Sequence, residues 1–545
     1  MVLRRNKSHV LDDLSLQQRL RSVTLQQNLC DFRWTDMMIP GLRCSTAIVT
    51  LPLLAALAMP VGAQTLTFWD IDDGTAGVQG GTGTWTDTGQ NFLTVGPPGP
   101  PESNDAFVNG EGVSFGGTAG TVTIAAGTSP GVSELRFTVD GYVLTGDEIR
   151  SQPPVIPGGG AVIGLEGSAT IESDLDGSFS VETPDGPGSG HTLFLTGTNA
   201  GLDELSVGAD VTVDAVDIGG RTNVAADGTF LYRGTVGSTL PGPSDDVIVS
   251  SGTVRAEDAG AVVDGDVVLN GGEAFLQGQV VDDIDVNAGA ILTVEAGNAL
   301  EVGDEVTVDD AGSSLLVRGD LTALGAGPLS IEAGADTTVQ VFNGATVEAD
   351  ITTGGALILE GAADGLADVT GDVETTGGSA DIQGDIEGDL TLGAGTTVTQ
   401  TGVLAVSGDL TNGADVVTTA DVSADSVTNT GSLDIDAGVL TINGTDPLDN
   451  QGVLTVGTQV VGGVLNTGTA TIEDGGDVDN DFVNSGAGAI GTILGNVDGD
   501  VRNEDGGTLT FGSLTDDGAT VGGSFTNLGT AEFLTAAGGL TVVTG

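Results

Sequence analysis

From about residue 161 to the end of the chain, apolar and polar residues alternate in short runs of four to six residues. Gly, Asn or Asp bounds these runs, as in AVVDGDVVLN, ILTVEAGNALEV, SLDIDAGVLTI and GTLTFGSL. A period of two predicts half-buried β-strands, and the bounding residues predict turns between them. The 3.6-residue period of an amphipathic helix is absent from this pattern.

A loose repeat is clearest near the C-terminal end, where an apolar residue, one spacer and Asn precede a glycine-containing turn and a new strand. The spacings between its asparagines add up to 98 residues over five intervals, or about 20 residues per unit, which lies within the range of solenoid repeats. These asparagines are Asn429, Asn450, Asn466, Asn484, Asn503 and Asn527. A second element, Gly-Asp before an apolar residue, begins at Gly265, Gly319, Gly371, Gly408 and Gly499.

These repeats predict an all-β fold, a parallel β-solenoid with about 20 residues per coil. Asn, Asp and Gly tolerate positive φ, so we expect them to turn the chain sharply after each strand. If every coil makes the same turns, each strand lies over the strand one coil earlier and inward Val, Leu, Ile and Phe side chains form a continuous core. Stacked asparagines would then hydrogen-bond to one another along the stack. Residues 161–545 would form roughly 19 coils, a rod on the order of 90 Å long at about 4.8 Å per coil.

Composition agrees with a thin, stacked core. Hydrophobic residues make up 39% of the chain but aromatic residues only 4%, so small and β-branched side chains must fill the interior. Both cysteines, Cys30 and Cys44, precede residue 64, and a body without cysteine depends on packing and on hydrogen bonds between strands.

The charge balance is strongly acidic. The chain has 77 acidic and 14 basic residues; four of the acidic and seven of the basic ones precede residue 64, which leaves 73 against 7, or a formal charge of −66, for the rest. Such a surface repels nucleic acid and anionic membranes, and it favours solubility. Two carboxylates stacked one coil apart repel by about 0.9 kcal/mol in water, so we expect stability to rise with salt or calcium. We predict no cofactor, with weak, non-specific Ca²⁺ binding as the alternative.

The N-terminal region predicts export. Residues 44–63 form a signal peptide, with Arg43 before it, an apolar run from Ile48 to Met59 and the small residues Val61-Gly62-Ala63 at its end. Residues 1–43 are an N-terminal extension, or the true start is Met37 or Met38. A Pro/Gly-rich stretch at 151–160 separates a segment at 64–150 from the repeats at 161–545.

The segment 64–150 resembles the passenger region of Gram-negative autotransporters with Trp/Gly-rich passenger-associated repeats. The matching motifs cover about 80 residues: Trp69-Asp70, Gly80-Gly81-Thr82-Gly83-Thr84-Trp85, Asn91-Phe92, Asp105-Ala106-Phe107, Gly120-Thr121-Val122-Thr123, Leu135-Arg136-Phe137 and Gly141-Tyr142-Val143-Leu144-Thr145-Gly146. The resemblance implies a right-handed parallel β-helix, exported through the periplasm to the cell surface or the outer membrane, with a structural or adhesive role. It also implies an outer-membrane β-barrel translocator as partner. The chain ends without barrel-like strands, so we expect either a truncated sequence, with the barrel in cis, or a barrel supplied in trans.

We predict no catalytic, cofactor-binding or metal-ligating residue. Two G-x-S-x-G matches, around Ser114 and Ser129, lack a following helix, and His191 is the only histidine in the body that could serve as a base. The glycine motif at 486–491 precedes a strand and a turn rather than a helix. The Arg318-Gly319-Asp320 tripeptide shares its Gly-Asp with other strand starts. The enzymatic alternative is a β-helical hydrolase of a neutral polysaccharide, which needs paired carboxylates.

Overall fold

The computed structural model describes residues 66–72, 77–94, 104–152, 160–184, 190–225, 227–237, 247–360, 368–512 and 519–533. They belong to one compact unit, Ala63–Gly545. The predicted extension 1–43 and signal segment 44–63 lie outside the described residues.

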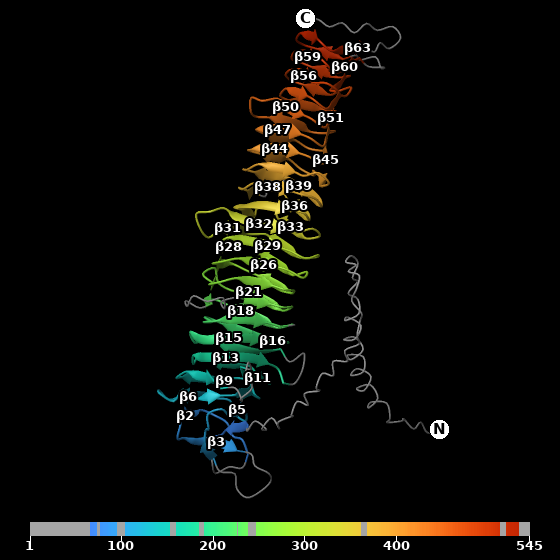
Figure 1. Cartoon of the computed structure of the whole chain (residues 1–545). Coiled ribbons are helices and arrows are strands. Elements are labelled where there is room, and N and C mark those ends of the chain that lie inside the picture. Colours follow the sequence, from blue (N-terminus) through green and yellow to red (C-terminus); the bar gives the residue numbers. More distant parts are fainter. Residues whose placement is uncertain are drawn as a thin grey trace, which may run out of the picture. The chain divides into compact units, whose positions relative to one another are not determined.

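Every regular element of the described residues is a β-strand, and the strands form three parallel sheets that run along a solenoid (Figure 1). One coil contributes β29 (Glu305–Val308), β30 (Ser314–Val317) and β31 (Asp320–Ala323) to the first, second and third sheet. The next coil adds β32 (Leu329–Ala333), β33 (Thr338–Val341) and β34 (Thr346–Val347), each paired in parallel with its predecessor. The third sheet begins at β19 (Thr235–Val236), and earlier coils contain two sheets. No helix long and apolar enough to span a bilayer occurs in these described ranges.

The coil length matches the repeat predicted from the sequence. Along the second sheet, Thr338 and Thr530 are 192 residues and ten coils apart, or about 19 residues per coil. The predicted β-solenoid is therefore confirmed. The strands of these coils are β36 (Ala356–Leu359), β39 (Ser379–Ile382), β42 (Thr397–Thr399), β45 (Asp415–Thr418), β48 (Ser432–Ile435), β51 (Val453–Val456), β54 (Thr469–Ile472), β57 (Ile490–Ile493), β60 (Thr508–Phe511) and β63 (Thr530–Phe533).

The core forms because alternate residues of every strand point inward. Leu315, Val339 and Leu357 occupy the same position in successive coils of the second sheet and are fully buried. Most of their outward neighbours are polar or small, with Leu316 and Ile358 as exceptions, which explains the alternation in the sequence. Burying such side chains stabilises the stack by about 1.5–3 kcal/mol each.

Asparagine forms a buried ladder on the first sheet. Its members end β44 (Asp409–Asn412), β47 (Ser426–Asn429), β50 (Leu448–Asn450), β53 (Val464–Asn466), β56 (Phe482–Asn484), β59 (Val501–Asn503) and β62 (Phe525–Asn527). Each Nδ2 donates a hydrogen bond of 2.6–2.8 Å to the Oδ1 of the next asparagine. The predicted ladder is confirmed, and Asn412 adds a rung to it.

The expectation that these asparagines turn the chain through positive φ is wrong. None of them has a positive φ, and all except Asn527 are buried. The glycine two positions later has a different role from the expected one. At Gly452, whose φ is also not positive, a Cβ would lie 2.0 Å from the backbone oxygen of Gly431, so the close approach of successive coils requires glycine.

The Gly-Asp element forms a second ladder at the start of first-sheet strands, except at Gly319, where it begins β31 of the third sheet. Oδ1 of Asp372 accepts the backbone N–H of Asp389 at 2.8 Å, and Oδ1 of Asp389 accepts that of Asp409 at 2.8 Å. Each carboxylate therefore satisfies a backbone donor of the following coil.

The N-terminal end of the stack is closed by antiparallel strands and aromatic rings. β1 (Leu66–Trp69), β3 (Gln90–Thr94) and β4 (Asn104–Ala106) pair antiparallel, while β1 also pairs in parallel with β5 (Gly112–Phe115). Trp69, Trp85, Phe92, Phe107 and Phe115 pack together, with ring centroids 4.9–6.4 Å apart. Parallel pairing continues across 151–160, since β8 (Glu134–Phe137) pairs with β11 (Ala161–Leu165).

Candidate functional site: a groove on the first sheet

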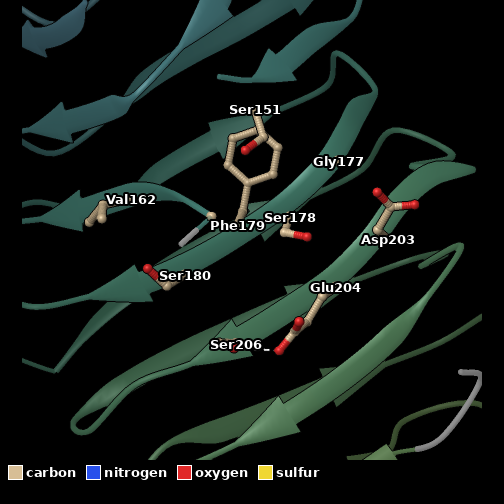
Figure 2. Close-up of a pocket in the computed structure, with 10 residues that line it drawn as sticks. Ser151, Val162, Gly177, Ser178, Phe179, Ser180, Asp203, Glu204 and Ser206 are labelled. Atoms are coloured by element: carbon tan, nitrogen blue, oxygen red, sulfur yellow. Dashed lines mark hydrogen bonds between the residues drawn. The ribbon is translucent and has the colours of Figure 1, made fainter. Parts of the chain in front are cut away.

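A groove of about 700 Å³ opens on the first sheet near the N-terminal end of the solenoid (Figure 2). It spans three coils, formed by β10 (Ile149–Ser151) with β11, by β13 (Leu175–Glu182) and by β15 (Gly201–Val207). Four serines, two carboxylates, two glycines, one valine and one phenylalanine line it. These are Ser151, Gly160, Val162, Gly177, Ser178, Phe179, Ser180, Asp203, Glu204 and Ser206.

The groove lies where one coil supplies two strands, β10 and β11, to the first sheet. The start of β13 pairs with β10 through Leu175 and Asp176, while its end pairs with β11 from Phe179 to Glu182. Gly177 and Ser178 thus lie where β10 ends and β11 begins, Gly177 beside Ser151 and Ser178 beside Gly160. Gly177 has a φ of +93°, and a Cβ at Gly160 would lie 2.5 Å from the backbone oxygen of Ser178, so both positions require glycine.

A β-bulge turns Asp203 toward the groove. Gly177 pairs with Leu202 and Ser178 pairs with Glu204, so Asp203 is the extra residue of β15. Two consecutive side chains, Asp203 and Glu204, therefore face outward, whereas Leu202 and Leu205 on either side are buried. Bulges re-aim side chains in this way and occur often beside functional sites.

The hydrogen bonds of the groove leave polar atoms available to a ligand. Oε1 of Glu204 accepts Nδ2 of Asn223 at 2.6 Å and the hydroxyl of Ser206 at 3.4 Å. Oγ of Ser151 accepts the backbone N–H of Ala161 at 3.1 Å, so its own proton can be donated elsewhere. Asp203 has no hydrogen-bond partner among the described residues.

Cationic groups flank the groove rather than line it. Nε of Arg150 lies 3.5 Å from Oδ2 of Asp176, and Arg150 also contacts Glu148. At the N-terminal side, Glu134 pairs in register with the lining residue Val162. Burial raises the pKa of the Glu134 carboxyl, and its neighbours Glu182 and Glu166 add to that shift while Arg136 opposes it. The local field is therefore negative and disfavours anionic ligands.

This arrangement supports binding more directly than catalysis. Serine hydroxyls donate and accept hydrogen bonds and carboxylates accept them, which suits a ligand rich in hydroxyl groups. Both carboxylates come from β15 and are consecutive in the chain, whereas a glycosidase places its two carboxyl groups on either side of the scissile bond. Within the described ranges, no three His, Cys, Asp or Glu side chains gather in a way that could hold a metal ion.

The residues of the serine-hydrolase motif do not come together. Ser114 is buried on β5, in register with Phe68 and Arg136. Ser129 lies in a turn, where its hydroxyl is 3.3 Å from Oδ2 of Asp147. His191 begins β14 (His191–Leu195), in register with Val211 on β16 (Val211–Ala215).

The other two motifs are structural elements of the solenoid. Arg318 and Gly319 connect β30 to β31, and the Arg318 guanidinium stacks 4.1 Å from the ring centroid of Phe342. The tripeptide therefore lies against the sheet and not at a loop tip. The glycines at 486–491 belong to a turn and to β57.

Sequence reasoning missed the groove residues, although one signal was present. The segment GLDELSV places Asp203 and Glu204 side by side in a strand that otherwise alternates. A break in alternation of this kind marks a bulge. The division of this coil into β10 and β11 has no comparable signature beyond the Pro/Gly-rich stretch.

No family model, curated protein or solved structure matches this chain.

Proposed function

We propose that this protein is exported and forms a β-helical rod at the cell surface, with the structural and adhesive role of the autotransporter passengers that it resembles. The resembling motifs include Trp69, Trp85 and Phe92, which pack together at the N-terminal end of the solenoid. The predicted signal peptide at 44–63 supports export.

The observation that carries this proposal is the continuous parallel stack. Every coil uses about 19 residues and adds about 4.8 Å of length, so the stacked coils build an elongated body. An elongated body holds its outer faces and loops away from the site where it is anchored. A β-barrel translocator, in cis or in trans, would be its partner at the outer membrane.

The second sheet offers a contact surface suited to adhesion. Between β51 and β60 its outward positions carry no charge, although the chain has a net charge of −63. Contact surfaces are poor in charged residues at their centres. The outward residues are Val453, Thr455, Thr469, Thr471, Ile490, Thr492, Thr508 and Thr510.

Export can be tested with the full chain in a Gram-negative host. We expect processing after Ala63 and digestion by protease added to intact cells that also carry a suitable β-barrel. Leu54→Arg, which interrupts the apolar run of the signal segment, should leave an unprocessed chain in the cytoplasm. Leu14→Arg, outside that run, is the matched control. A wild-type chain that stays unprocessed and protected in the cytoplasm would overturn the proposal.

A further inference from the structure

We propose that the groove on the first sheet binds a neutral oligosaccharide. This inference deepens the proposed function, because it names a ligand class for an adhesive rod. It rests on the shape of the groove, the polar atoms that converge in it and the charge around it.

The shape fits a short segment of a polymer. The groove follows the solenoid axis over three coils, or about 10 Å between the first and third strand at 4.8 Å per coil. A volume of about 700 Å³ is within the range of sites that enclose small ligands. Figure 2 shows the lining side chains on strands that follow one another along the sheet, which is the direction that a polymer segment would take.

The outward positions of the groove floor carry mainly hydroxyl groups, with one apolar side chain among them. Val162, Ser180 and Ser206 occupy the same outward position on successive coils. The neighbouring position is held by Ser178 and then Glu204. A sugar ring presents hydroxyl groups at its edge and C–H groups on its faces, so it matches a surface that offers both.

Asp203 is the residue expected to contribute most to binding. The bulge turns its carboxylate outward, and no described residue satisfies it. A carboxylate accepts two sugar hydroxyls at once, and hydrogen bonds to a charged acceptor are stronger than those between neutral groups. Glu204 has a supporting role, since Asn223 and Ser206 already bind its Oε1 and leave Oε2 to face a ligand.

Charge decides against the other ligand classes. Acidic sugars and phosphorylated ligands require Lys or Arg, and none lines the groove. Of the cations beside the groove, Arg150 is engaged by Glu148 and Asp176, and Arg221 lies on the following coil in register with the acidic Glu204. A cationic ligand would find acidic side chains throughout this surface, so it would not select the groove.

The test is calorimetric titration of the purified full chain with defined hexasaccharides. The neutral probes are maltohexaose, cellohexaose, xylohexaose and mannohexaose; hexagalacturonate and a chitosan hexamer are the anionic and cationic probes. We expect at least one neutral probe to bind with 1:1 stoichiometry, little affected by 0.5 M NaCl, and hexagalacturonate not to bind.

Variants then locate the site. Asp203→Ala should weaken binding at least tenfold, and Asp203→Asn, which keeps an acceptor oxygen, should weaken it less. Ser180→Tyr should fill the groove and abolish binding; if its circular dichroism or Tm departs from wild type, Ser206→Tyr is the substitute. Glu374→Ala, an exposed acid on β38 (Val373–Thr375) of the same sheet, is the matched control and should bind normally.

Three results would overturn the proposal. The first is that no neutral probe binds, and the second is that binding survives both the Asp203 and the groove-filling substitutions. The third is that the chitosan hexamer binds best and that 0.5 M NaCl abolishes its binding. Cleaved fragments of a neutral probe would replace the binding role with the hydrolase alternative. The measurement uses purified protein, so its failure leaves surface display untouched, and a failure of export in cells leaves sugar binding untouched.

Discussion

Replacing one rung of the asparagine ladder tests whether buried amides hold the C-terminal coils together. Asn466 lies in the middle of the ladder and is fully buried. Its Oδ1 accepts Nδ2 of Asn450 at 2.6 Å, and its Nδ2 donates to Oδ1 of Asn484 at 2.7 Å and to the backbone oxygen of Ile490 at 2.9 Å. Asn466→Leu keeps a similar volume and removes these three hydrogen bonds, together with a longer one of 3.3 Å from Nδ2 to the backbone oxygen of Gly468.

The magnitude follows from what the leucine leaves behind. Nδ2 of Asn450 keeps the backbone oxygen of Thr469 at 2.9 Å, but Oδ1 of Asn484 loses its donor in a buried position. Three hydrogen bonds at about 1 kcal/mol each, plus an unsatisfied acceptor at about 1–3 kcal/mol, are offset by about 1.5–3 kcal/mol from burial of leucine. We expect a net destabilisation of about 1–4.5 kcal/mol.

Hydrogen exchange by mass spectrometry is the suitable assay, because a solenoid is stabilised mainly by contacts between neighbouring coils. In Asn466→Leu, exchange should accelerate in β50, β53 and β56 and remain unchanged in coils before β44. Asn527→Leu, at an exposed rung, is the matched control and should change exchange far less. If Asn466→Leu protects these strands as well as wild type does, the amide ladder is not a stabilising element.

Three further substitutions or conditions test other parts of the fold. Eight carboxyls of the described residues have raised pKa values and two have lowered ones, and burial is the first cause of each increase. A carboxyl with a raised pKa binds its proton more tightly in the folded than in the unfolded chain. Its contribution to folding stability is therefore fully present below the unfolded pKa of about 4 and is lost as pH rises through the folded pKa. We expect a higher Tm at pH 5 than at pH 7.5, and a smaller Tm difference between these two pH values in Asp283→Asn. At pH 7.5, NaCl should raise the Tm because it screens the carboxylates. A Tm that falls on acidification to pH 5 would contradict this reasoning. Thr418 is buried among Leu and Val side chains, with Gln400 beside them, and makes only a 3.5 Å hydrogen bond. Thr418→Val should therefore stabilise by about 1 kcal/mol in chemical denaturation, and a loss of stability would show that the hydroxyl matters. Gly452→Ala should destabilise the protein by several kcal/mol, because its Cβ would lie 2.0 Å from the backbone oxygen of Gly431. Gly327→Ala is the control: its Cβ would meet open space and its φ is not positive, so its stability should stay within about 0.5 kcal/mol of wild type. Equal effects of the two substitutions would refute the close-approach argument.

The sequence predicts those features that every coil repeats. Alternation gives the inward positions, the spacing of Asn429 to Asn527 gives the coil length, and both are confirmed because register is fixed wherever one face is buried. The role of the asparagines is harder to read from sequence. An Asn at the end of a strand can turn the chain or point inward. The inward position is favoured only where another Asn, one coil away, hydrogen-bonds to its side chain.

Features that occur once have no periodic signal, which is why the groove was not predicted. It depends on the bulge at Asp203, on the division of one coil into β10 and β11, and on glycines at 160 and 177. Each is a local departure from the repeat, and their coincidence in three adjacent coils is a property of the stacked structure. In a solenoid, a candidate binding site is therefore best sought where neighbouring coils differ.

The Gly-Asp ladder explains how a chain with so many carboxylates can stack them at the spacing of one coil. Asp372, Asp389 and Asp409 follow one another along the first sheet, where bare charges would repel by about 0.9 kcal/mol per pair in water. Each carboxylate instead accepts a hydrogen bond from the next coil, and Ser426 donates to Asp409 at 2.7 Å. Because these hydrogen bonds are exposed, each contributes less than a buried charge-assisted one, but it offsets a repulsion of this small size. Acidic residues at these turns therefore serve the fold as well as solubility, and the glycine before each of them keeps the coils close enough for the hydrogen bond to form.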